Sequence, residues 1–94
     1  MYTHLQDFEK DLRAQGYDEV HEVHWAPYAE VEPHQHPFAA KAVVIRGEMW
    51  LTIGTHTRHL GRGGAFELGP GELHSERYGS EGATYWVARR GPQG

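Results

Sequence analysis

Cysteine is absent from this 94-residue sequence, and its absence excludes both disulfide cross-links and thiolate metal sites. Any metal ion must therefore be bound by histidine or carboxylate side chains. Basic side chains are also scarce, since 9 of them stand against 13 acidic ones, for a formal net charge of −4 with neutral histidines. Because this charge gives little attraction to phosphate backbones or anionic lipids, we expect no nucleic-acid or membrane partner.

Long apolar runs are missing too. No segment approaches the roughly 20 apolar residues that a transmembrane helix requires, and the opening segment is too charged for a signal peptide. We therefore expect a cytoplasmic protein. The length predicts a single domain with a modest core, and such a domain often gains stability from a second copy of itself or from a bound ion.

The pattern that is present begins with a helix. Residues 1–16 predict one amphipathic helix that belongs to the same domain, with Thr3 as N-cap, Gln6 as its capping-box partner and Gly16 just beyond the last turn. Three apolar residues lie at helical spacing: Leu5, Phe8 and Leu12. We expect the helix to lie across the body of the domain.

Short strands account for the rest of the pattern. From Tyr17 onward, alternating or β-branched runs are separated by glycine and proline turns. The expected strands are 19–25, 39–45, 48–53, 56–60, 65–68, 73–78 and 84–89. Many short strands at nearly regular spacing are typical of an antiparallel barrel or sandwich, so residues 17–90 are expected to be all-β, followed by a disordered tail at 91–94.

Histidine is abundant, with 8 residues, and neutral imidazole is the commonest protein metal ligand. His34 and His36 are two residues apart, so both rings leave the same face of one strand if this stretch is extended. His74 lies on a later predicted strand, and inward side chains of distant strands converge inside a barrel. Surface or interface positions are expected for the other histidines: His4, His21, His24, His56 and His59.

Taken in order, these residues resemble the two sequence motifs of the cupin family. The first motif reads His34-Gln35-His36-Pro37-Phe38-Ala39-Ala40-Lys41 and is followed by apolar residues and Gly47. The second reads Gly63, five residues, then Gly69-Pro70-Gly71-Glu72-Leu73-His74, and fifteen residues separate Gly47 from Gly63. That spacing is similar to the short hairpin between the motifs of small microbial cupins, and the resemblance covers about half of the chain.

The resemblance to small single-domain cupins implies an antiparallel, RmlC-like jelly-roll barrel. It also implies a divalent metal ion such as Zn, Fe, Ni or Mn, bound by His34, His36 and His74. One departure concerns the carboxylate that usually follows the second histidine of the first motif, because that place falls on Ala40 or Lys41. The site therefore resembles that of three-histidine cupin dioxygenases.

The residues after His74 are candidates for proton chemistry. Glu76 and Tyr78 share the strand phase of His74, so we expect both to face the ion. Glu76 is a candidate ligand, orienting group or base, and Tyr78 is a candidate partner in proton transfer. A solvated or interface position is the alternative for Glu76. Lys41 has the phase opposite to the histidines and is expected outside the barrel.

The expected lining of the site is apolar. Phe38 shares the phase of the first two histidines, and other strands present Met49, Leu51 and Phe66 inward. Together these residues predict a small apolar pocket for a small-molecule ligand, with the metal at its floor.

Two tryptophans fall on the outward phase of their strands. Trp50 and Trp86 alternate with the expected core residues and are therefore predicted to be exposed. Exposed tryptophan on a small barrel favours a homodimer. The alternative is that the helix or the first strand covers them.

Three functions are compatible with this sequence. The resemblance implies a metal-dependent enzyme, dioxygenase-like or isomerase-like, that acts on a small oxygenated substrate. The first alternative is a non-catalytic sensor or ligand-binding module with a structural ion. The second alternative is a decayed site in a barrel that serves as a scaffold for dimerisation.

Overall fold

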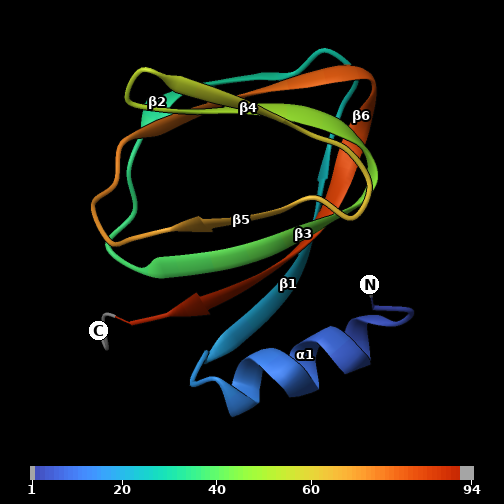
Figure 1. Ribbon diagram of the computed structural model, residues 1–94, viewed down its shortest axis with the longest axis vertical. Coiled ribbons are helices and arrows are strands. Elements are labelled where there is room, and N and C mark those ends of the chain that lie inside the picture. The colour runs from blue at the N-terminus through green and yellow to red at the C-terminus, as the bar shows by residue number, and fades with distance from the viewer. Residues whose placement is uncertain (1, 92–94) are drawn as a thin grey trace.

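In the computed structural model, which describes residues 2–91, one helix precedes six strands (Figure 1). The elements are α1 (Leu5–Ala14), β1 (Glu19–Trp25), β2 (Glu30–His34), β3 (Ala39–Ile53), β4 (His56–Leu60), β5 (Ala65–Leu68) and β6 (His74–Arg90). Every strand pair is antiparallel. The expected all-β jelly roll with a short N-terminal helix is confirmed. The tail expected at 91–94 lies outside the described residues except for Gly91.

Two long strands, β3 and β6, build both layers of the barrel (Figure 1). The first half of β3 and the second half of β6 form one layer with β1 and β5. Their other halves form the second layer with β2 and β4. The change of layer falls at Gly47, whose φ is +78° and where an added Cβ would lie 2.1 Å from the Gly82 carbonyl oxygen. Only glycine fits this crossing of two backbones.

The observed strand bounds agree with the sequence-based prediction for some strands and differ for others. Strands β1, β4 and β5 have the expected bounds. The expected pairs 39–45 with 48–53, and 73–78 with 84–89, are instead continuous as β3 and β6. The prediction of turns at these breaks was wrong because the glycines form bulges, which bend a strand without ending its ladder.

Strand β2 was not expected, because the sequence around it is rich in proline. It lies at an edge and pairs only with β6 among the described strands. Pro33 falls at the register shift between Val31 and His34, where no ladder hydrogen bond is required of it. Edge position and irregular pairing together make proline tolerable there.

The helix α1 begins at Leu5 after His4, which has extended backbone and acts as N-cap without a side-chain hydrogen bond. The predicted capping box of Thr3 and Gln6 is therefore wrong, since the helix starts one residue too late for it. Gly16 lies just beyond the helix with a φ of +97°, which agrees with its predicted place after the last turn. No helix within residues 2–91 has the length and apolar character to cross a membrane.

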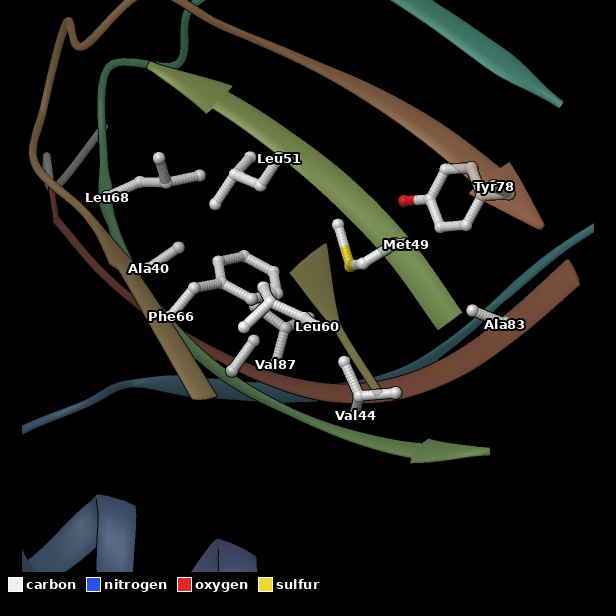
Figure 2. Close-up of a cluster of buried hydrophobic side chains, with 11 residues drawn as sticks. Ala40, Val44, Met49, Leu51, Leu60, Phe66, Leu68, Tyr78, Ala83 and Val87 are labelled. Carbon is white, nitrogen blue, oxygen red and sulfur yellow. The ribbon is translucent and has the colours of Figure 1, made fainter. Parts of the chain in front are cut away.

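The barrel interior is filled by apolar side chains from both layers (Figure 2). Met49, Leu51 and Phe66 are all buried there, with Val44 and Tyr78 beside them. Figure 2 shows these side chains pointing toward one another between the strands. The core thus sits between the two layers and leaves the polar cluster described below at one side of it.

A second, smaller core lies between α1 and the outer face of the β1-containing layer. Phe8 and Leu12 of the helix pack there against Val43, Trp86 and Ala88. The predicted exposure of Trp86 is therefore wrong: it is only 6% exposed, and the Trp86 indole Nε1 donates a hydrogen bond to Glu22.

Trp50 keeps the outward position that its phase predicts. It is half-buried between the His59 ring, at 4.8 Å between centroids, and the Arg77 guanidinium, whose Cζ lies 4.8 Å from the Trp50 ring centroid. The expected homodimer stays a prediction, and it now depends on Trp50 alone.

Candidate metal site

Three histidine rings meet inside one end of the barrel. His34 is the last residue of β2 and His74 the first of β6, and these two residues are cross-strand partners. Ring centroids lie 4.2 Å apart for His34 and His74, 4.8 Å for His34 and His36, and 5.4 Å for His36 and His74. One nitrogen from each ring lies within 4.8 Å of the others. This is a donor cluster of the size that a metal ion requires.

His36 reaches the cluster from a loop. The chain leaves β2 at His34 and crosses to the other layer, where β3 begins at Ala39. The expectation of two histidines on one strand is therefore corrected, because the crossing to the other layer starts between them. The Gly71 N–H donates a 2.7 Å hydrogen bond to the His36 carbonyl and ties this loop to the turn before β6.

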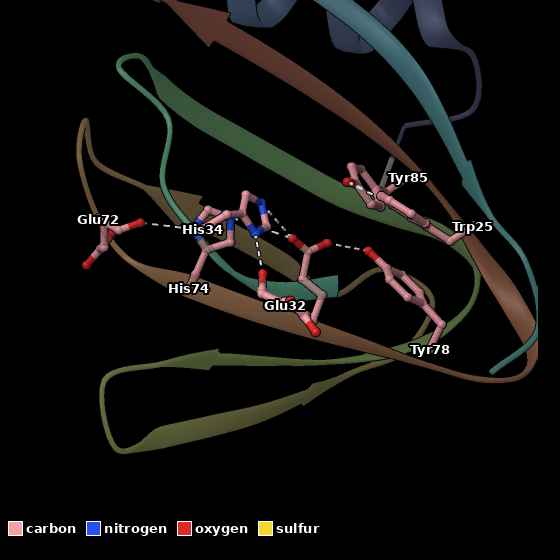
Figure 3. Close-up of polar contacts among 8 residues, drawn as sticks. Trp25, Glu32, His34, Glu72, His74, Tyr78 and Tyr85 are labelled. Carbon is pink, nitrogen blue, oxygen red and sulfur yellow. Dashed lines mark hydrogen bonds and ion pairs between the residues drawn. The ribbon is translucent and has the colours of Figure 1, made fainter. Parts of the chain in front are cut away.

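Backbone carbonyls fix the orientation of two of the rings. The His34 Nδ1–H donates to the Glu32 carbonyl at 2.8 Å, and the His74 Nδ1–H donates to the Glu72 carbonyl at 2.9 Å (Figure 3). A neutral imidazole that is protonated at Nδ1 has its lone pair on Nε2. Both rings therefore present Nε2 as an acceptor or metal ligand.

Glu76 brings a carboxylate to the same place. It is buried, it follows His74 on the inward face of β6, and its partner in register on β3 is Leu51. The Glu76 Oε2 atom lies 3.5 Å from His74 Nε2 and 3.8 Å from His34 Nε2. Neither an ionised carboxylate nor this imidazole tautomer has a hydrogen to share, so the arrangement requires a proton or a cation between these atoms. The donor set fits a divalent ion.

Tyr78 holds the other oxygen of this carboxylate. Its buried hydroxyl donates a hydrogen bond to Glu76 Oε1 (Figure 3). Burial, reinforced by Tyr85 and Glu76, raises the pKa of Tyr78 far above its ordinary range, so the hydroxyl stays protonated and remains a donor. The Trp25 indole Nε1 in turn donates to the Tyr85 hydroxyl at 3.3 Å. A line of polar groups therefore runs from the cluster into the barrel core.

His36 has a distinct environment within the cluster. Its ring stacks on Phe38 with centroids 4.8 Å apart and an interplanar angle of 13°. Burial, reinforced by the neighbouring His34 and His74 rings and by Arg89, lowers the pKa of His36, although Glu76 opposes the effect. The lowered pKa favours the neutral ring, which is the form that binds a metal.

The other residues expected around the site lie as follows. Phe38 is partly buried against His36, whereas Met49, Leu51 and Phe66 belong to the packed core. A groove of about 410 Å³ is lined by residues that include Trp50, Arg77 and the site residue Glu76.

Lys41 points outward, as expected, and its Nζ donates to Gln15. The histidines for which the sequence predicted surface positions, His4, His21, His24, His56 and His59, are all exposed.

The sequence did not identify Arg89 or Tyr85 as residues of this site. Both lie on β6 and have the inward phase of Val87, which is a core residue. Their shared phase with Val87 was the available signal, but it indicated only apolar packing.

Comparison with known proteins supports the fold. The family model of the AraC-like ligand binding domain matches residues 17–93. No individual curated protein matches the chain. Among solved structures, the Cupin_2 domain of an XRE family transcriptional regulator from Enterobacter cloacae is 23% identical, with a TM-score of 0.64 over 79% of this chain and 81% of that one.

Two further solved structures, both of longer chains, share this fold. The DMSP lyase DddQ from Ruegeria pomeroyi is 24% identical, with a TM-score of 0.73 over 79% of this chain and 38% of that one. The cupin domain of Cnp3 from Schizosaccharomyces pombe is 16% identical, with a TM-score of 0.71 over 78% of this chain and 55% of that one. At these identities the likeness shows the fold alone.

Proposed function

Because this chain belongs to the family of AraC-like ligand-binding domains, which are small cupins, we propose that its function depends on a divalent metal ion bound by His34, His36 and His74. Three imidazoles that leave coordination positions open suit such an ion. The observation that carries the proposal is the convergence of the three rings, each with one nitrogen within 4.8 Å of the others, beside a carboxylate oxygen of Glu76 that lies 3.5 Å from His74 Nε2 and 3.8 Å from His34 Nε2. A cation bound by the three imidazoles would occupy their lone pairs and would offset the charge of the Glu76 carboxylate beside them.

The proposed activity is metal-dependent chemistry on a small oxygenated ligand. An ion bound by three histidines would supply a Lewis acid beside the ligand. In this proposal, the Glu76 Oε2 atom holds the proton that the ligand gives up. Tyr78 keeps the carboxylate in that orientation by its hydrogen bond to Oε1. The packed core of Met49, Leu51 and Phe66 excludes water from the far side of the carboxylate.

A sensor function is the second candidate, in which the ion binds a ligand without turning it over. The same packed core favours it, since a filled barrel leaves little interior room for a substrate. Resemblance to a domain of a transcriptional regulator is compatible with this candidate. Turnover separates the two candidates, and oxygen consumption by Fe²⁺-loaded protein is the first assay, because it detects the dioxygenase-like case directly.

Elemental analysis of untagged protein tests the metal site itself. We expect about one divalent ion per chain in the wild type and a loss to background in His74→Ala, because a site of three ligands rarely survives the loss of one. His56→Ala is the matched control, since His56 is exposed at the start of β4. Metal at background in the wild type would overturn the proposal and favour a decayed site.

A further inference from the structure

One arginine lies on the inner face of the barrel next to the histidine cluster. On the last part of β6, Trp86 and Ala88 face the helix, whereas Val87 faces the core. Arg89 follows in the phase of Val87 and is partly buried. Its neighbour Arg90 has the opposite phase, is exposed, and lies over the ring of Tyr17. Two adjacent arginines therefore occupy opposite faces of the layer.

Arg89 is connected to the metal site through aromatic stacking. Its Cζ atom lies 4.8 Å from the centroid of the Phe38 ring, and the Phe38 ring stacks on His36 at 4.8 Å. The cation thus belongs to the same end of the barrel as the three histidines.

Among the described residues, neither the charge nor one donor of Arg89 has a partner. The Arg89 Nε atom is buried and has no hydrogen-bond partner. Within residues 2–91, no carboxylate lies within ion-pair distance of Arg89. A buried donor without a partner and an unpaired cation both cost free energy, so a counter-charge at this place is stabilising.

Two nearby carboxylates, Glu19 and Glu76, have other partners. Glu19 faces Arg89 across the β1–β6 ladder, but its side chain is 60% exposed and contacts His21 at 3.4 Å. Glu76 accepts from Tyr78 and faces the histidines. The missing counter-charge is therefore one that a ligand can bring.

We infer that Arg89 is the anion-binding residue of this site and that the ligand is a small carboxylate. The inference rests on the proposed function, because a second oxygen of the ligand is to reach the ion on His34, His36 and His74. A planar carboxylate matches the planar guanidinium fork with two parallel hydrogen bonds. Phe38 lies under the guanidinium and restricts the side chain to this position. Arg89 thus sets the ligand class, while the histidines hold the ion.

Succinate is the test probe. The neutral diamide succinamide and inorganic phosphate are the two comparison probes. Calorimetry on Zn²⁺-loaded protein, freed of excess ion, gives the affinity of each probe. We expect the wild type to bind succinate in preference to both other probes. Arg89→Gln is expected to weaken succinate binding by about ten- to a hundredfold, the loss typical of a charge-assisted hydrogen bond. Arg90→Gln is the matched control and should stay within about threefold.

Other variants and readouts keep the result interpretable. Arg89→Lys keeps the charge but lacks the fork, so it should fold and still bind succinate more weakly than the wild type. Zn²⁺ affinity is measured on every variant and should not change. Equal succinate binding by wild type and Arg89→Gln, or equal binding of succinate and succinamide, would overturn the inference. Preference for phosphate would overturn the assignment to carboxylates.

Failure of the proposed function has a different signature. In that case the wild-type protein binds no Zn²⁺, whatever the probe. The comparison of wild type with Arg89→Gln is then made on the metal-free protein. Loss of succinate binding in the variant supports the anion site by itself, whereas unchanged binding overturns it.

Discussion

Tyr78 donates its hydroxyl hydrogen to one oxygen of Glu76, while the other oxygen of that carboxylate faces the Nε2 atoms of His34 and His74. Both residues are buried, and both lie on the inward face of β6. One hydrogen bond inside the apolar core thereby sets the direction of the only carboxylate at the described histidine cluster.

Removing that hydroxyl should destabilise the protein. In Tyr78→Phe a buried carboxylate oxygen loses its donor, and we expect the free energy of unfolding to fall by about 1–3 kcal/mol. Urea denaturation of the metal-free protein measures the change. Tyr28→Phe is the control, because Tyr28 is 71% exposed and its loss of a hydroxyl should change stability by less than about 0.5 kcal/mol. Equal effects of the two substitutions would contradict a stabilising role for the bond.

Acidification should weaken metal binding. A histidine must be neutral to bind an ion, and imidazole ordinarily protonates near pH 6.5. Because the pKa of His36 is lowered, this ring stays neutral to a more acidic pH, and its contribution is lost only below about 6.5. Zn²⁺ calorimetry from about pH 8 to pH 5 should show a plateau followed by a fall. Constant affinity over that range would count against histidine ligands.

The same shift affects the stability of the metal-free protein. The unfolded chain protonates His36 at its ordinary pKa, before the folded chain does, so the unfolded state binds more protons below about pH 6.5. The contribution of His36 to stability is therefore complete above that pH and declines during acidification. Denaturation of wild type and His36→Gln across this range isolates it, and a parallel pH dependence of the two proteins would refute it.

Gly47 should not tolerate a side chain. An added Cβ would lie 2.1 Å from the Gly82 carbonyl oxygen, on a backbone with φ of +78°. We expect Gly47→Ala to lower the free energy of unfolding by at least about 2 kcal/mol. Gly54→Ala is the matched control, because Gly54 also has a positive φ, +61°, but an added Cβ there meets nothing within 4 Å. Similar losses in both variants would assign the effect to backbone conformation alone.

The helix should stabilise the barrel without affecting the metal site. Phe8 is 2% exposed and packs against Trp86 with ring centroids 6.0 Å apart. Phe8→Ala is expected to cost about 3–5 kcal/mol and to shift the tryptophan fluorescence. Zn²⁺ affinity should be unchanged as long as the variant remains folded, since α1 packs outside the barrel. A variant with normal stability would show that α1 contributes little to the fold.

Local patterns in the sequence carry much of this fold. Strands β4 and β5 were predicted with their bounds because alternation and glycine turns are features of a few adjacent residues. The grouping of His34, His36 and His74 also followed from short motifs with a defined spacing. Pro33 obscured β2, since proline is tolerated only where a strand is at an edge or irregular.

Features that depend on tertiary pairing were less accessible. That Gly47 and Gly82 pass close to each other is visible only once β3 and β6 are paired. The burial of Trp86 depends on where α1 docks, which the phase of its own strand does not indicate. An inward arginine such as Arg89 reads as a surface residue from sequence, because its neighbours along the chain include an outward arginine.

Strand β6 continues through its glycine-containing bend, so the residues after the bend alternate strictly between the face toward the helix and the face toward the barrel interior. A one-residue insertion between Gly79 and Gly82 would exchange the two faces of everything downstream. Trp86 would enter the barrel and Arg89 would turn toward the helix. The number of residues in that bend therefore determines both whether Trp86 can pack against the helix and whether Arg89 places its charge inside the barrel.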